Sequence, residues 1–109
     1  MGRFQLTQKG TQWHFDLQAG NYEPILHSEM YETKAAALNG IESVRKNSAR
    51  DGAFEEKVAK NGQHYFVLKS TNGQIVGQSE MYESTSGCKN GVQSVMKNAP
   101  EATVVEEEK

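Results

Sequence analysis

Ser-Glu-Met-Tyr-Glu-Thr at residues 28–33 returns as Ser-Glu-Met-Tyr-Glu-Ser at residues 79–84, 51 positions later. At the same offset, Asn-Gly-Ile-Glu-Ser-Val-Arg-Lys-Asn at 39–47 returns as Asn-Gly-Val-Gln-Ser-Val-Met-Lys-Asn at 90–98. A repeat of about 50 residues indicates one supersecondary unit that the chain uses twice. The architecture is therefore predicted from one unit and its copy.

The length of the chain bears on how the two copies are organised. With 109 residues in total, each repeat is near the lower size limit for independent folding. We expect a single domain over residues 1–109 with one shared core, closed about a pseudo-twofold axis as in a fused homodimer. Repeat one is predicted over 2–52, repeat two over 53–106, and an acidic tail over 106–109. Because the second copy takes the place of a second subunit, a monomer is expected.

Within each repeat, the apolar period changes from two to the helical period after the repeated motif. Trp13, Phe15 and Leu17 alternate with polar residues, as in a half-buried strand. Thr33 and Ser84 are good helix N-caps, and apolar residues follow each of them at spacings of three and four. Each repeat is therefore expected to contain three strands and then a helix.

The segment between the copies, residues 53–58, resembles both the end and the beginning of a repeat. Residues 53–56 align with 104–107 after the second helix and with 3–6 at the start of the first copy. One strand is thus expected to end copy one and to begin copy two, so that terminal strands are swapped. The predicted class is α+β: a duplicated strand-strand-strand-helix-strand unit that forms one mainly antiparallel sheet with two helices on one face.

The repeated pattern F-x-L, then S-E-M-Y-E-[ST], then N-G-[IV]-x-S-V-x-K-N resembles the YegP-like family of small bacterial proteins. The resemblance covers residues 2–100 in both copies. It implies two units in a single sheet that swap their terminal strands, with two helices on one side. It implies no activity and supplies no catalytic residues. The copies differ where Pro24 stands in place of Ile75 and where copy two has an extra residue near Lys60, so an altered edge or bulge is expected there.

Charge and composition argue against several classes of function. The formal net charge is −2, and the acidic C-terminus accounts for it, so the body of the chain is near neutral. A neutral body favours neither nucleic acid nor an anionic membrane as a partner. No apolar stretch is long enough to cross a membrane, and no signal peptide is visible. The lone Cys88 cannot form an intramolecular disulfide, so a cytoplasmic location is expected.

The residues that most often carry chemistry form no reactive pattern. His14, His27 and His64 lack the spacing of metal ligands, so neither a metal nor a cofactor is expected. Cys88 lies on the apolar stripe of the second helix, which indicates a buried small hydrophobe and not a nucleophile. No catalytic triad or phosphate-binding glycine loop is present in the sequence. We therefore expect a protein that is not an enzyme.

Gly40 and Gly91 lie in the middle of the two predicted helices. Glycine in that position costs about 1 kcal/mol relative to alanine. A cost repeated at both equivalent positions indicates that another group approaches each helix closely.

Two binding hypotheses remain open. The leading one is a non-enzymatic interaction module that docks a protein partner on the sheet face away from the helices, at His14, Asp16, Tyr65 and Val67. The alternative is small-ligand binding at the pseudo-twofold seam between the repeats, at Glu29, Tyr31, Glu80 and Tyr82. The repeated motif also has a structural interpretation, because a strand-to-helix junction must satisfy free backbone amides and anchor the helix. Nucleic-acid binding is a weaker third alternative.

Overall fold

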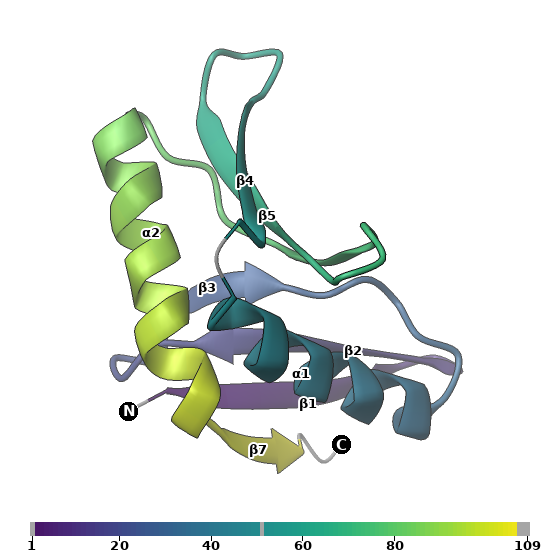
Figure 1. Ribbon diagram of the computed structural model, residues 1–109. Helices are drawn as coiled ribbons and strands as arrows, with labels where there is room; N and C mark the ends of the chain where they lie inside the picture. Colours follow the sequence, from purple (N-terminus) through teal and green to yellow (C-terminus); the bar gives the residue numbers. More distant parts are fainter. Residues whose placement is uncertain (1, 51, 107–109) are drawn as a thin grey trace.

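The computed structural model describes residues 2–50 and 52–106 and has the predicted α+β class (Figure 1). The sheet order is β4-β5-β6-β3-β2-β1-β7, and α1 and α2 lie on one side of it. In chain order the elements are β1 (Arg3–Lys9), β2 (Gln12–Gln18), β3 (Pro24–His27), α1 (Lys34–Ser48), β4 (Phe54–Val58), β5 (His64–Lys69), β6 (Ile75–Gln78), α2 (Thr85–Asn98), the 3-10 helix η1 (Ala99–Glu101) and β7 (Thr103–Glu106).

The terminal strands are swapped, as the alignment of the connecting segment predicts. β7 lies parallel to β1, with Phe4 opposite Val104, while the other neighbouring strands are antiparallel. β4 occupies in copy two the place of β1 in copy one, because Phe54 pairs with Leu68 as Phe4 pairs with Leu17. The first strand of copy one is therefore covered by the last strand of copy two.

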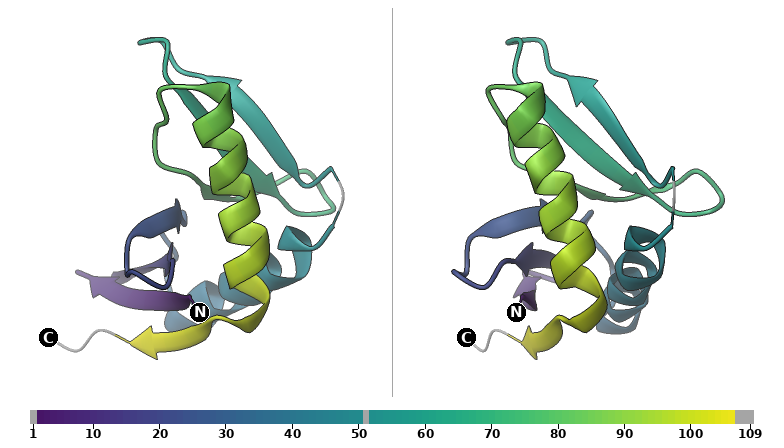
Figure 2. Two further views of the ribbon diagram at one scale, coloured as in Figure 1. Left: turned by 90° about the vertical axis from the view of Figure 1, so that its left-hand side faces the viewer. Right: turned by 60° about the vertical axis from the view of Figure 1, so that its left-hand side comes forward.

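The two copies meet in the middle of the sheet, between β3 and β6. Only one residue pair joins these strands, His27 with Gln78. Beyond this line the β4–β5 hairpin rises away from β1, β2 and β3 (Figures 1 and 2). The seam between the repeats is thus a narrow contact within the sheet.

One cluster of buried side chains joins both repeats. α1 contacts β5 and β6 of the other copy as well as β2, and α2 contacts β3 as well as β5. Cys88 is buried in this cluster, which confirms its predicted role as a small hydrophobe. The largest fully buried residues of the cluster are Phe4, Leu6, Phe15, Leu17, Leu26, Ile41, Val44, Phe66, Leu68 and Val95.

Each helix begins at its predicted cap. Thr33 Oγ1 accepts a hydrogen bond from the Ala36 amide at 3.0 Å, and Ser84 Oγ accepts one from the Gly87 amide at 3.0 Å. These contacts satisfy amides that the first helical turn leaves without a partner. Within the part of the chain that the structure describes, no helix has the length and apolar character needed to cross a membrane.

The Ser-Glu-Met-Tyr segment bridges an irregularity in the pairing with β2. Between the paired residues Asp16 and His27 and the paired residues Trp13 and Tyr31, β2 advances three residues while the facing segment advances four. Ser28 Oγ fills the resulting break, because it accepts from the Phe15 amide at 2.8 Å and donates to the Glu29 carbonyl at 2.8 Å. This supports the structural interpretation of the motif. Copy two makes the same contacts with Ser79, Phe66, Glu80, His64 and Tyr82.

The mid-helix glycines admit the tyrosines of the repeated motif. Tyr31 stacks on Phe15, with ring centroids 6.1 Å apart, and its hydroxyl lies beneath α1. A Cβ on Gly40 would lie 2.5 Å from Tyr31 Oη, closer than real Cβ contacts. Gly91 has the same relation to Tyr82 in copy two. The expectation of close packing at both glycines is confirmed.

The structure refines two expectations, one about the chain end and one about the departures from the repeat. Glu106, where repeat two was expected to end and the acidic tail to begin, is the last residue of β7, lies opposite Leu6 and forms an ion pair with Lys34. The remainder of that tail, residues 107–109, lies outside the described residues. The strand registers shift beside Pro24 and also at the equivalent place in copy two, so the irregularity belongs to the repeat and not to proline.

We predict that Gly91→Ala destabilises the protein by about 1–3 kcal/mol, because the new methyl group overlaps Tyr82. Urea unfolding measures the change. Gly87→Ala in the same helix is the matched control, since its Cβ would have ordinary contacts of 3.4 Å or more. That substitution should stabilise by about 0.5–1 kcal/mol through helix propensity. Equal effects of the two substitutions would contradict the close-packing explanation.

Candidate functional site

A row of side chains crosses the sheet face that points away from the helices. Its members lie opposite one another because the registers of six strands are continuous across the seam. The pseudo-twofold axis passes between the two central members, His27 and Gln78. From β1 to β4 the row is Gln5, Asp16, His27, Gln78, Val67 and Glu55.

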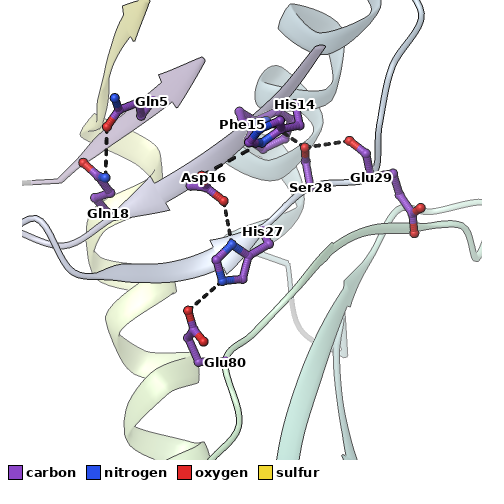
Figure 3. Close-up of polar contacts among 9 residues, drawn as sticks. All are labelled: Gln5, His14, Phe15, Asp16, Gln18, His27, Ser28, Glu29 and Glu80. Carbon is purple, nitrogen blue, oxygen red and sulfur yellow. Dashed lines mark hydrogen bonds and ion pairs between the residues drawn. The ribbon is translucent and has the colours of Figure 1, made fainter. Parts of the chain in front are cut away.

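His27 is bonded on both ring nitrogens, once within its own repeat and once across the seam. Nδ1 lies 2.5 Å from Asp16 Oδ1, and Nε2 lies 2.7 Å from Glu80 Oε1. Figure 3 shows the ring between these two carboxylates. The hydrogen bond to Asp16, with a further contribution from Glu80, raises the His27 pKa to about 9 against the opposing effect of burial. A protonated His27 therefore links copy one to copy two at neutral pH.

A cavity of about 240 Å³ opens beside this imidazolium. It is lined by His27, Ser28, Glu29, Gly77, Gln78 and Ser79, so both repeats contribute to it.

The groups around the cavity differ in whether they are free to bind. Ser28 and Ser79 are not free to bind, because the hydroxyl of each already forms hydrogen bonds with the backbone where the strand pairing is irregular. Among the contacts of the described residues, none engages the side chain of Glu29 or of Gln78. In Figure 3 the Glu29 carboxylate points away from the His27 contacts. A free carboxylate and a free amide therefore border the cavity.

The charges near the cavity do not balance. Asp16, Glu29 and Glu80 supply three carboxylates, and His27 supplies one positive charge. The surplus is negative, and a cationic group with N–H donors would complement it. A phosphate or a carboxylate would be repelled there.

The structure separates the four residues predicted for the seam into two kinds of position. Glu29 and Glu80 lie at the seam, on the cavity wall and on His27 respectively. Tyr31 and Tyr82 pack beneath α1 and α2 of their own repeats, and Tyr31 also borders a second cavity together with Glu29 and residues 73–76 of copy two. Burial is the main cause that raises the pKa of both tyrosines. The four side chains do not surround one cavity, because each tyrosine anchors a different helix.

The four residues predicted for the open face differ in their exposure. Asp16 is on that face and holds His27, while His14 and Tyr65 are half-buried beside the row. Val67 was expected to be exposed there but is 1% exposed. Its strand is internal to the sheet, so the longer side chains of Glu55 and Gln78 flank it in the ladder and cover it. Val67 therefore does not contribute to a docking surface.

The central residue of the site was not predicted from the sequence. His27 was considered only as a metal ligand, although Asp16 from one hypothesis and Glu80 from the other both bind it. The available signal was a break in the repeat, since His27 and Asp16 correspond to Gln78 and Val67 in copy two. Two paired positions that differ on one sheet face indicate that only one copy has an ionic pair there.

Comparison with known proteins shows close relatives over nearly the whole chain. One family model, described as a domain of unknown function (DUF1508), matches twice, at residues 8–55 and 59–106. A UPF0339 protein of Pseudomonas aeruginosa is 59% identical over 99 residues, which span 91% of this chain and 90% of that protein. The UPF0339 protein YegP of Escherichia coli O157:H7 is 45% identical over 104 residues, 94% of each chain.

Two solution NMR structures have the same fold. A UPF0339 protein from Shewanella oneidensis superposes with a TM-score of 0.90 at 45% identity, covering 96% of this chain and 90% of that chain. The protein of unknown function yegP from E. coli gives 0.91 at 43% identity, covering 97% and 92%. The names of these relatives state no activity, so what the seam can bind has to be inferred from the residues of this chain.

We predict that the His27 contacts stabilise the protein below about pH 6.5 and that this stabilisation is lost as the pH rises to about 9. The direction follows because the folded-state pKa lies above the ordinary value of 6.5. Since the His27 side chain is 40% exposed, solvent screening limits the effect to about 1 kcal/mol. Urea unfolding at about pH 6 and pH 9.5 measures it.

His27→Gln is the matched control, because glutamine occupies the equivalent position 78 in copy two. Its unfolding free energy should lack this part of the pH dependence. The same pH dependence in both proteins would contradict the assignment to His27.

Proposed function

Since the chain belongs to the family of DUF1508 repeats, as its resemblance to YegP-like proteins predicts, we propose a non-enzymatic binding module that takes a small cationic group at the seam between its repeats. The observation that carries this proposal is the surplus of carboxylates around the seam cavity. Asp16, Glu29 and Glu80 supply three carboxylates, whereas His27 supplies one positive charge. The ligand class is an amine or a guanidinium, free or on a side chain.

The size of the cavity supports a small group. At about 240 Å³ it is below the usual range of roughly 300–1,000 Å³ for sites that enclose a whole drug-sized ligand. A guanidinium has planar N–H donors that suit carboxylate and amide oxygens. The free carboxylate of Glu29 and the free amide oxygen of Gln78 supply such acceptors from both repeats.

The state of the reactive groups supports a role without chemistry on the ligand. His27 is protonated and bonded on both nitrogens, so it has no lone pair with which to act as a base. Burial raises the pKa of the Cys88 thiol, with Glu56 adding to it, and this disfavours the nucleophilic thiolate. Each group is held in its less reactive form.

The seam is favoured over the other two hypotheses. On the open sheet face, Val67 is buried and Asp16 is engaged by His27, which leaves only the half-buried His14 and Tyr65 for a partner. Nucleic acid has a polyanionic backbone, which the carboxylates of the seam would repel. The seam offers both a cavity and the free polar groups of Glu29 and Gln78.

We further propose that the chain acts as one monomeric domain of two repeats, residues 2–52 and 53–106, with 53–58 shared between them. The buried cluster that contains side chains of both repeats supports this organisation. A cytoplasmic location is proposed as well. Its support is the single cysteine, Cys88, which is buried as a free thiol.

We predict that methylguanidinium shifts the amide resonances of residues 27–29 and 77–80, whereas its neutral isostere methylurea does not. The difference isolates the positive charge, which the carboxylates of the seam attract. Titrations of the ¹⁵N-labelled protein at low salt measure both probes. Equal shifts with both probes, or shifts confined to other residues, would remove the basis for the proposal.

Glu29→Gln provides the matched variant, because the Glu29 side chain has no hydrogen bond or ion pair to lose in the described part of the chain. Methylguanidinium should bind about twofold to fivefold more weakly, which corresponds to an exposed ion pair of about 0.4–1 kcal/mol. Unchanged affinity in this variant would show that Glu29 takes no part in binding.

A further inference from the structure

The two ends of the sheet are not equivalent. At one end, β7 covers the outer edge of β1. At the other end, β4 occupies the place of β1 in copy two and pairs only with β5. Figure 2 shows β4 at the outer margin of its hairpin in both views. Among the described residues, no strand covers the outer edge of β4.

The two hairpins match closely enough for a direct comparison. Phe4 contacts Phe15 edge to face, with ring centroids 5.8 Å apart and planes at 75°. Phe54 contacts Phe66 in the same way, at 5.7 Å and 70°. Phe4 and Phe54 therefore hold the same position in their copies. The way in which β7 pairs with the edge of β1 therefore predicts how a strand would pair with the edge of β4.

The uncovered edge leaves apolar side chains partly exposed. Phe4 is 0% exposed, whereas its equivalent Phe54 is only half-buried. Arg45 of α1 covers the Phe4 ring and donates to the carbonyl of Ala102, just before β7. Its equivalent in α2 is Met96, which is 38% exposed. At this edge copy two therefore leaves Phe54 and Met96 partly exposed, whereas in copy one β7 and Arg45 cover the equivalent place.

The backbone of β4 has hydrogen-bonding groups to offer at this edge. The Ala53 carbonyl accepts from the Lys69 amide, and the Ala59 amide donates to the Gln63 carbonyl. Because alternate residues of a strand point to opposite sides in the plane of the sheet, Phe54, Glu56 and Val58 turn their N–H and C=O groups outward. The backbone of another extended strand can replace water along such a row and bond to all of it at once.

Charge distinguishes the occupant of this edge from β7. In copy one, Leu6 lies opposite Glu106, whose carboxylate pairs with Lys34. In copy two, the position of Leu6 is held by Glu56 and that of Lys34 by Thr85. Among the described residues, no ion pair involves Glu56. An acidic residue at this place would meet Glu56, whereas lysine or arginine would complement it.

From these observations we infer that the outer edge of β4 binds an extended peptide segment of another protein. The segment runs parallel to β4, with an apolar residue opposite Phe54 and a basic residue opposite Glu56 two positions later. β7 of the same chain already pairs with β1, so the occupant comes from another molecule. β5 and β6 separate this edge from the seam, so the inference does not depend on the proposed ligand there.

Two blocked peptides with the sequence of residues 100–108 test the inference, one natural and one carrying Glu106→Lys, because this length reaches the position opposite Val58 in the stated register. Each is titrated into the ¹⁵N-labelled full-length protein at low salt. The lysine peptide should shift the amides of Phe54, Glu56 and Val58 and bind about fivefold more tightly than the natural peptide. No shift on β4, or shifts confined to β1 and β7 through displacement of the protein's own strand, would overturn the inference.

Glu56→Lys should reverse the preference, so that the natural peptide binds more tightly than the lysine peptide. Glu32→Lys changes the net charge equally at an exposed residue of copy one and should leave the preference unchanged. A reversal in both variants would mean that net charge and not Glu56 selects the peptide, which would overturn the stated register.

Val58→Pro tests the backbone contribution, because it removes an outward N–H while β4 remains paired with β5 through its inward groups. The variant should keep its amide spectrum and bind the lysine peptide about fivefold more weakly. Unchanged binding to a folded Val58→Pro variant would count against strand addition at this edge.

Discussion

Strand exchange between the repeats is the constraint on which the rest of the structure depends. Two units of four strands need eight strand positions, and the chain fills them with seven strands because β4 serves both units. The first strand of copy one is covered by the last strand of copy two, so neither repeat is complete alone. A strand that serves twice cannot also cover its own outer edge. The shared core, the central seam and the uncovered edge of β4 all follow from this arrangement.

The duplication also permits differences that an exact homodimer could not have. Beside the pseudo-twofold axis, Leu26 occupies the space where a Cβ on Gly77 would lie, at 2.7 Å from its side-chain carbons. Two leucines at these equivalent positions would compete for the same volume, and two glycines would leave it empty. The outer face shows the same divergence, since copy one carries an ionic pair where copy two has a neutral one. A site on the axis can thus be built from unlike halves.

The local features of the fold were predictable because each depends on a few neighbouring residues. Thr33 and Ser84 cap the helices, and the strand alternation puts Phe15 and Leu17 on the core side. The cost of a mid-helix glycine indicated a close approach at Gly40, and the structure identifies Tyr31 as its partner. The candidate site was predicted only in part. Its carboxylates Asp16 and Glu80 came from two separate hypotheses, because the sequence does not reveal that a third side chain joins them.

The sequence by itself determined the class of fold, the exchange of terminal strands and the positions of the caps, since repetition and periodicity express them directly. The tertiary structure alone decided that His27 lies between Asp16 and Glu80, because this contact depends on the register of β3 against both β2 and β6. It also decided that Val67 is buried, since burial on a sheet face depends on the lengths of the neighbouring side chains. A strand pattern predicts which face a residue occupies, but the cross-strand neighbours decide what that residue can contact.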